Sequence, residues 1–401
     1  MKFIHFADAH LDSPFLGLSF LPSNQFYRIQ QAPNQSLTKI VDLALQEQVD
    51  LVLIAGDTFD SSRPTPSSQL FFARQIKRLT AAEIQVVMIF GNHDHMQATD
   101  LLVPESPYFK LLGAGEQVET ATFKTAAGFV YTVNGFSYLN NHITTDLAAQ
   151  LPTKSSNYTF GLMHAQEKAS SNQNVYAPFT LSELKDLHYD YFALGHIHLR
   201  QILSEDPLIV YPGNIQGRHI NERDAKGCYL GEINEQTKQT TIKFVPTSPI
   251  KWAKAQVKLT EEISQNDLRE QILASMKPQE PTYYSLEIVG AEFLNEQEQE
   301  LLKDSSFWQA LSEQLTDSQL VDVRFATNSR LQIAASDQVY FSQAAAEIFT
   351  ADKFRALSKS WAKKDDLATE LAQEPQFLQE IKELAAVNLN NKLKGLSDET
   401  D

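Results

Sequence analysis

The tetrapeptide Gly91-Asn92-His93-Asp94 contains the residue types that most directly suggest chemistry in this chain. It follows the apolar run 85–90, which has the length and β-branched content of a buried strand. The predicted strand therefore ends on a carboxamide, an imidazole and a carboxylate, groups that can bind a cation or move a proton. An ordinary Asx-type turn uses the same residues, so the tetrapeptide alone leaves both interpretations open.

Four other apolar runs end in the same way. Taken in chain order, the ligand-type residues at the five ends are Asp8 and His10, Asp57, Asn92 and His93, His164, and His196 with His198. Oxygen and imidazole donors without a thiolate suit Mn²⁺, Fe²⁺ or Zn²⁺, with Mg²⁺ as a further candidate. Residues two apart in an extended segment point the same way, so both members of an Asp-x-His or His-x-His pair can reach one ion. If His93 is set aside, the remaining groups are too many for one ion and suit two that share a carboxylate.

A pair of ions roughly 3.5–4 Å apart would hold a phosphate group, activate a bridging water, and stabilise both the attacking and the leaving oxygen. His93, turned away from the ions, would then act as the general acid on the leaving group. Asp94 or another carboxylate would fix the tautomer of His93. The predicted catalytic residues are therefore His93 and Asp94.

A single histidine more often packs in a core or lies on the surface than binds a metal. We assign to that class His5, His95, His142, His188 and His219, although His95 and His219 border the predicted site and stay open. Asp57 by itself could be a turn residue. The joint arrangement, in which successive strands end on ligand-type residues, favours the metal site.

The elements that must position these residues alternate along the first half of the chain. Residues 2–7 and 50–55 are predicted strands, like 85–90, while 35–48 has helical spacing and a second helix should run from a cap at Ser67 or Ser68 to about residue 79. This order is typical of a parallel or mixed α/β sheet, which binds ligands at the carboxyl ends of its strands.

The pattern changes after about residue 245. Residues 245–249 contain two prolines and are predicted to be a linker or crossing segment, and strands and helices alternate again beyond it. Residues 250–401 contain no histidine and no Gly-rich phosphate loop. The predicted domains are a first domain at 1–245 that carries the candidate ligands, a smaller α/β domain at 250–335, and a helical C-terminal region at 336–401.

Length and composition are those of an ordinary globular protein with two or three domains: 401 residues, of which 42% are hydrophobic and 21% charged. No apolar run approaches the roughly 18–20 residues that span a bilayer, and the first residues do not fit a signal peptide. The single cysteine, Cys228, cannot form an internal disulfide and fits a reducing compartment. We expect a cytoplasmic protein.

The net charge of −16 does not favour nucleic-acid binding through the overall charge of the protein, because nucleic acid is also negatively charged. Bound divalent cations and a local basic strip can reverse the potential at one face. A nucleic-acid substrate therefore stays open, whereas tight DNA binding by this chain alone is not expected.

The strand ends carry a set of motifs that resembles the calcineurin-like metallophosphoesterase superfamily over residues 1 to about 230. The motifs are Asp8-Ala9-His10, Gly56-Asp57-Thr58-Phe59-Asp60, Gly91-Asn92-His93-Asp94, the lone His164, and Gly195-His196-Ile197-His198. Within this superfamily, Asp12-Ser13-Pro14-Phe15 and the stretch from Tyr211 to His219 resemble the SbcD-type DNA repair exonucleases and their YhaO branch.

This resemblance implies a fold, a ligand set and a partner. The implied fold is α/β (α+β), a four-layer sandwich of two packed mixed β-sheets flanked by helices, followed by a smaller capping and helical region. One metal would be held by Asp8, His10, Asp57 and His198, and the other by Asp57, Asn92, His164 and His196. His93 matches the proton-donating histidine of the family. The implied partners are DNA and an SbcC-like, SMC-type ATPase, and relatives of this type commonly form a homodimer.

Two departures from related patterns bear on function. Archaeal and eukaryotic nuclease relatives have a second histidine where this chain has Asp60, which leaves open how a DNA end is oriented. Phosphoprotein phosphatases of the superfamily have an Asp-Arg-Gly motif that residues 59–63 do not match.

The sequence thus predicts a Mn²⁺-dependent phosphodiesterase acting on DNA, as a 3′-to-5′ exonuclease or an endonuclease near ends. The alternatives are a phosphodiesterase for a small phosphoester or cyclic nucleotide, and a non-catalytic, metal-stabilised regulator of the ATPase. A docking face for the ATPase could consist of Phe354, Leu357, Trp361, Leu367 and Leu371. Apolar residues at this spacing are more often core, and we favour that interpretation.

Overall fold

The protein is described by a computed structural model that covers residues 1–168, 175–278, 280–326 and 335–348, with the single positions 350, 353 and 381. The chain divides after Trp252 into two compact units. Residues 245–249 are packed within the first unit: Thr247 is buried, and its backbone N–H donates to the carbonyl of Lys226. The finer domain boundaries remain predictions, because most of residues 336–401 lies outside the described part of the chain.

The first unit is built on two six-stranded sheets. The first sheet has the order β12 (Thr240–Pro246), β11 (Gly227–Ile233), β1 (Lys2–Phe6), β2 (Leu51–Ala55), β3 (Gln85–Ile89) and β4 (Phe109–Leu111). The second has the order β5 (Glu119–Lys124), β6 (Val130–Gly135), β7 (Tyr158–His164), β8 (Tyr191–Gly195), β10 (Leu208–Tyr211) and β9 (Gln201–Glu205). Each has a parallel centre with antiparallel strands beside it, so both sheets are mixed.

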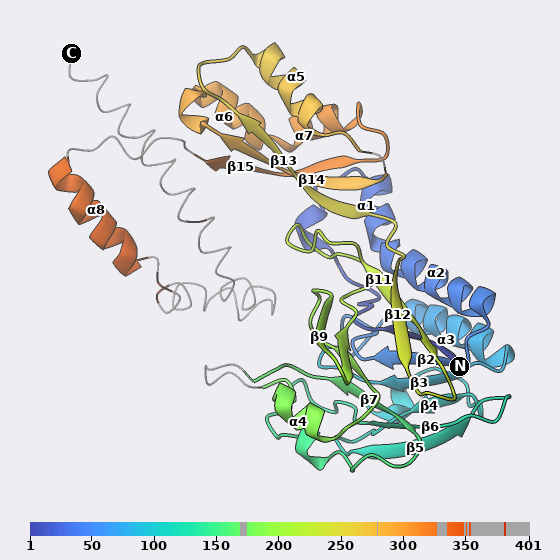
Figure 1. The fold of residues 1–401 in the computed structure, drawn as a ribbon. Coiled ribbons are helices and arrows are strands. Elements are labelled where there is room, and N and C mark those ends of the chain that lie inside the picture. The colour runs from blue at the N-terminus through green and yellow to red at the C-terminus, as the bar shows by residue number, and fades with distance from the viewer. Residues whose placement is uncertain are drawn as a thin grey trace, which may run out of the picture. The chain divides into compact units, whose positions relative to one another are not determined.

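The two sheets pack face to face through apolar side chains that alternate along their strands. Phe3, Leu53 and Val87 of the first sheet belong to the same buried cluster as Phe160 and Tyr191 of the second. Figure 1 shows the sheets as adjacent layers, with α2 (Ala32–Glu47) and α3 (Pro66–Ala81) beside the first. A cluster on the opposite side of the second sheet packs against α4 (Leu181–Asp186). The predicted sandwich of two packed mixed sheets flanked by helices is confirmed.

The helices of the first unit begin close to where the sequence pattern predicts. Helix α2 begins at Ala32, where the prediction began at residue 35, and buries Leu37, Ile40 and Val41 against the first sheet. The predicted cap of α3 was wrong: Thr65 is the N-cap, and its hydroxyl accepts from the backbone N–H of Ser68. The N-cap lies earlier in the chain than predicted because Pro66 fits the first turn of a helix, where no backbone N–H donor is required. The other helices of this unit are η1 (Leu16–Leu18), α1 (Ser23–Gln30), η2 (Ala98–Asp100) and η3 (Ala148–Gln150).

The second unit has its own sheet and core. Its strands are β13 (Lys251–Lys258), which begins at the end of the first unit, β14 (Thr282–Val289) and β15 (Gln319–Ala326), in that order. Its helices are α5 (Gln265–Ser275), η4 (Ala291–Phe293), α6 (Glu296–Lys303), α7 (Ser305–Ser312) and α8 (Ala335–Ile348). Leu268, Leu286 and Leu311 lie in one buried cluster that joins α5, β14 and α7. Among the described residues of both units, no helix has the length and apolarity to cross a membrane.

His5 lies between the two sheets and is fully buried. Its Nδ1 is 2.9 Å from the hydroxyl of Tyr191 and its Nε2 is 3.2 Å from the carbonyl oxygen of Leu194. A neutral ring satisfies both contacts by accepting at Nδ1 and donating at Nε2. Burial lowers the pKa of His5 to about 3, so the assignment of this residue to the core agrees with its surroundings.

We expect His5 to make the protein less stable in acid. The folded state keeps the His5 ring neutral down to about pH 3, whereas in the unfolded chain the ring binds a proton below its ordinary pKa of about 6.5. Stability is therefore lost as the pH falls from about 6.5 toward about 3. The loss is about 1.4 kcal/mol per pH unit, or about 2 kcal/mol between about pH 7 and about pH 5. Urea unfolding of His5→Gln should show a correspondingly shallower pH dependence, whereas His142→Gln, at an exposed position, should follow the wild type. Parallel curves for wild type and His5→Gln would contradict the assignment.

Candidate metal centre

The carboxyl ends of parallel strands from both sheets meet at one edge of the first unit. From the first sheet, Asp8 follows β1, Asp57 follows β2 and Asn92 follows β3. From the second sheet, His164 ends β7 and His196 follows β8. An isolated parallel bridge between Ala7 and Asn214 links the two sheets at this edge.

Four of the predicted ligands have backbone conformations that non-glycine residues seldom adopt. Asp8, His10, Asp57 and His196 have φ values of 52°, 43°, 50° and 100°. Such conformations cost of the order of 1–3 kcal/mol each and persist only where the surrounding structure enforces them. Their concentration on predicted ligands indicates that these side chains are held in place at the expense of local stability.

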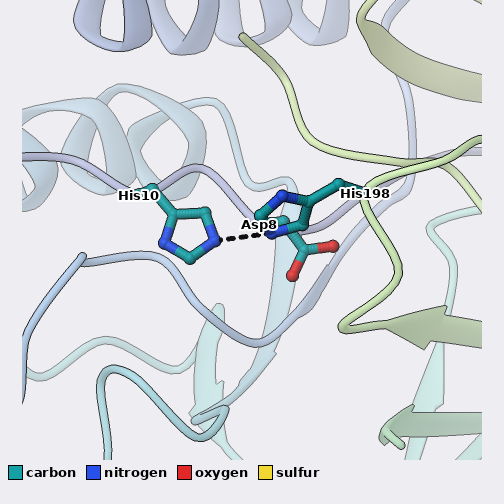
Figure 2. A group of neighbouring side chains, drawn as sticks. All are labelled: Asp8, His10 and His198. Carbon is teal, nitrogen blue, oxygen red and sulfur yellow. Dashed lines mark hydrogen bonds between the residues drawn. The ribbon is translucent and has the colours of Figure 1, made fainter. Parts of the chain in front are cut away.

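One cluster of donors consists of Asp8, His10 and His198 (Figure 2). One donor atom from each lies within 4.8 Å of the others. The Nε2 atoms of His10 and His198 are 3.0 Å apart. Asp8 is fixed by the backbone N–H of His196, which donates to its two carboxylate oxygens at 3.1 and 3.2 Å.

A second cluster consists of Asp8, Asp57 and His164. Asp57 Oδ2 is 3.3 Å from His164 Nε2 and 3.9 Å from His10 Nε2, so this carboxylate lies between the two clusters. Asn92 Oδ1 is 2.9 Å from His164 Nε2 and 3.0 Å from His196 Nδ1. The structure therefore brings together all the predicted ligands.

The donor chemistry fits divalent cations. Two imidazole nitrogens that face each other at 3.0 Å, as in His10 and His198, cannot both present lone pairs without repulsion unless a proton or a cation lies between them. Asp8 and Asp57 are almost fully buried, and a buried carboxylate needs a positive partner. With nitrogen and oxygen donors only, the set suits two borderline or hard divalent cations.

The pKa values of the buried groups depend on one another. Burial raises the pKa of Asp8. For Asp57, burial opposes ionisation, but His164 and His93 hold the pKa well below its ordinary value. Burial likewise opposes the charged form of His164, but Asp57 and Asp8 raise its pKa to about 9. A cation that binds here must therefore displace a proton from His164.

Gly91 has a steric role at this site. A Cβ at this position would overlap the Asp57 carboxylate, so only glycine allows the loop after β3 to lie this close. Gly56 has φ of 86°, and a Cβ there would lie 2.6 Å from His164 Nδ1. Both glycines permit close approach of the backbone to the ligands.

His93 lies at the rim of the site, with 25% of its side chain exposed. Its backbone N–H donates to Asp57 Oδ1 at 2.9 Å, and its Nδ1 is 3.2 Å from the carbonyl oxygen of Asp60. Its ring meets the ring of His10 edge to face, with centroids 4.9 Å apart. The contact to Asp60 favours a proton on Nδ1, which leaves Nε2 available for a substrate atom.

Asp94 does not orient His93, and that prediction was wrong. Its Oδ1 accepts from the backbone N–H of Gly91 at 2.6 Å, and its Oδ2 accepts from those of Thr58 and Phe59 at 2.7 and 3.4 Å. The carboxylate is fully buried and joins the loops after β2 and β3. Three backbone donors occupy its oxygens, and the group that faces His93 Nδ1 is the carbonyl of Asp60.

Sequence reasoning assigned no contact with the ligands to several residues that surround them. Asp60 Oδ1 is 3.0 Å from His10 Nδ1 and 2.7 Å from Arg218 Nη2. Glu222 Oε1 is 2.5 Å from His198 Nδ1, and Glu222 Oε2 accepts from Asn214 Nδ2 at 2.6 Å. Arg218 and Asn214 lie in a stretch singled out by resemblance, but spacing gave no reason to join Glu222 to a histidine 24 residues earlier in the chain.

The remaining histidines occupy varied positions. His95 Nδ1 is 2.9 Å from the carbonyl oxygen of Asn92, and His219 Nε2 is 3.4 Å from Glu222 Oε1, so both border the site. His142 is exposed and stacks on Tyr176. His188 has positive φ at the end of a turn after α4.

Comparison with known proteins identifies the family. Residues 1–200 match the model of the calcineurin-like phosphoesterases. The N-terminal domain belongs to this family. The chain is 37% identical to metallophosphoesterase YhaO of Bacillus subtilis over 65% of its length and 64% of the relative. It is 25% identical to the DNA double-strand break repair protein Mre11 of Saccharolobus solfataricus over 59% and 61% of the two chains.

A third similar protein is a component of the nuclease SbcCD of Staphylococcus epidermidis, at 24% identity over 63% of this chain and 71% of that protein. The matches to YhaO and to Mre11 each cover less than two thirds of the relative. The chain therefore spans only part of the length of these two relatives, and the ligand residues remain predictions supported by their geometry.

The position of Asp94 predicts a structural effect of its substitution. In Asp94→Asn, the amide group can accept on one side only, so one buried backbone donor faces an NH₂ group. We expect a loss of about 1–3 kcal/mol in unfolding free energy, measured by urea denaturation of the metal-free protein. Asp100→Asn, at an exposed position, is the control. Unchanged stability together with lost activity would instead support a role for Asp94 in orienting His93.

Proposed function

We propose that the chain is a metal-dependent phosphodiesterase that acts on DNA. The observation that carries this proposal is the convergence of Asp8, His10, Asp57, Asn92, His164, His196 and His198 at one edge, with His93 at the rim. Neither carboxylate at the centre is arranged as a nucleophile, because each is held among imidazoles and backbone amides. The arrangement instead suits hydrolysis by water.

When bound, divalent cations would supply the activated water and neutralise the phosphate charge. The protein's own contribution is to fix the ligands and to move a proton. His93 is the candidate general acid, because its Nδ1 faces the Asp60 carbonyl and its Nε2 remains available to protonate the leaving oxygen. Asp57 holds the backbone of His93 in place, which ties the acid to the ligand set.

The choice of DNA rests on the relatives, which include a double-strand break repair protein and a component of a nuclease. Cleavage would be 3′-to-5′ exonucleolytic or endonucleolytic near ends. Because the net charge is −16, DNA capture should be shared with a partner. We propose an SbcC-like SMC-type ATPase and a homodimeric assembly. The apolar residues considered for docking, from Phe354 to Leu371, lie outside the described residues.

Manganese is the proposed metal, because Mn²⁺ accepts mixed carboxylate, amide and imidazole ligands. Mg²⁺ prefers oxygen donors, and four of the seven proposed ligands are imidazoles, so it should support less activity. Zn²⁺ and Fe²⁺ suit the same donors and belong in the same assay.

We predict that His93→Ala lowers hydrolysis by about 10²–10⁴-fold while Mn²⁺ binding persists, because a general acid contributes about this much and the ring is not among the proposed ligands. Activity should be measured with Mn²⁺, Mg²⁺ and chelator, on linear double-stranded DNA and on bis-p-nitrophenyl phosphate. His95→Ala is the matched control, since His95 lies beside the site on the same loop and its ring nitrogen Nδ1 faces the carbonyl of Asn92 instead of the ligand cluster.

The same assay separates the competing functions. Hydrolysis of the small diester without any DNA cleavage, even with the ATPase present, would favour a small phosphoester or cyclic nucleotide as substrate. A His93→Ala protein with full activity would overturn the assignment of the acid. Absence of metal-dependent hydrolysis in the wild type would favour a metal-stabilised regulator of the ATPase.

A further inference from the structure

Two of the predicted ligand histidines have a carboxylate behind them. His198 Nδ1 is 2.5 Å from Glu222 Oε1, and His10 Nδ1 is 3.0 Å from Asp60 Oδ1. In both rings the carboxylate contacts Nδ1, and Nε2 is not used in this contact. The Nε2 atoms are left to face each other at 3.0 Å.

Glu222 is held too firmly to be an incidental neighbour. Its side chain is 8% exposed. Its Oε2 accepts from Asn214 Nδ2 at 2.6 Å and from the backbone N–H of Arg218 at 2.7 Å. Because both oxygens are engaged, Oε1 is held against His198 Nδ1, with His219 Nε2 further away at 3.4 Å.

Arg218 connects the two carboxylates. Its backbone N–H binds Glu222, while its guanidinium Nη2 is 2.7 Å from Asp60 Oδ1 and its Nε donates to Ser13 Oγ at 3.1 Å. One segment, residues 214–222, therefore fixes the carboxylates behind both His10 and His198.

The other half of the site lacks this arrangement. His164 Nδ1 faces the carbonyl oxygen of Ala55 at 3.0 Å, and the carboxylate oxygen nearest to it among the described contacts, Asp8 Oδ1, is 3.9 Å away. His196 directs its Nδ1 toward the amide oxygen of Asn92 at 3.0 Å. A neutral carbonyl orients an imidazole but increases its basicity less than a carboxylate does.

We propose that Glu222 and Asp60 are positioning residues for His198 and His10, joined by Arg218, and that they make this half of the centre the tighter divalent-cation site. A carboxylate on Nδ1 keeps the proton there, leaves Nε2 as a lone-pair donor, and strengthens that donor. The inference rests on the metal centre of the proposed function, but not on DNA as the substrate.

The direct test is Glu222→Gln in the full-length chain, titrated with Mn²⁺ by isothermal calorimetry after chelation. If the glutamine oxygen accepts from Asn214 and Arg218, its NH₂ group must face His198 Nδ1. That contact forces the ring proton onto Nε2, the nitrogen that would bind the ion. We expect wild-type protein to show a tight and a weak class of Mn²⁺ sites, and the variant to lose about 10–100-fold in the tight class alone.

Two further variants separate positioning from folding. Asp60→Asn should weaken the same class of sites through His10, and it tests the proposal independently if Glu222→Gln does not fold. Glu116→Gln is the matched control, because Glu116 also accepts several hydrogen bonds, from Leu139 and Asn140, but lies away from the ligands. It should bind Mn²⁺ as the wild type does. Circular dichroism of the metal-free proteins checks that each variant is folded.

The outcomes distinguish this inference from the proposed function. Unchanged Mn²⁺ affinity in folded Glu222→Gln and Asp60→Asn would overturn the positioning role while leaving the phosphodiesterase proposal intact. Equal weakening of both classes would overturn the division of the centre into a tighter and a weaker half. A wild-type protein that binds no Mn²⁺ would overturn the metal centre itself, and the positioning role with it.

Discussion

The Asp57 carboxylate is the group on which the rest of the site depends. It is almost fully buried, and it is stable there because His164 and His10 face Oδ2 while the backbone N–H of His93 donates to Oδ1. A buried carboxylate without such partners would cost several kcal/mol. Its surroundings include residues from three other strand ends, so the position of this one charge links β1, β2, β3 and β7.

The close arrangement around Asp57 has a steric and a conformational cost. Gly91 is required because any side chain there would overlap the carboxylate, and Asp57 itself has positive φ. Asp94 offsets part of this cost by accepting backbone hydrogen bonds from the loops after β2 and β3. Asp94 therefore holds these two loops together through the protein's own hydrogen bonds, and such support of the residues around a site favours a preorganised geometry.

The two halves of the centre are built by different means. The loops after β2 and β10 place carboxylates behind His10 and His198, whereas His164 relies on a backbone carbonyl of β2. Imidazole donors in the two halves therefore lie in unequal electrostatic surroundings. If the centre holds two cations as proposed, this inequality would give their sites an order of filling. Residues 214–222, which lie beyond the stretch matched to the family, would then contribute to the chemistry of the centre.

The sequence by itself determined the strands and the donor-type residues that follow them, because an apolar run followed by Asp, Asn or His is a local pattern. It also indicated two packed sheets through resemblance, and the helices α2 and α3 through periodicity. Only the tertiary structure decided which groups form hydrogen bonds with one another around the ligands. Asp94 lies beside His93 in sequence yet binds the backbone of Thr58, and Glu222 reaches His198 across 24 residues. The physical reason is that these hydrogen bonds join loops that are far apart in the sequence. Which loops lie next to each other depends on how the two sheets pack, and local residue patterns do not specify that packing.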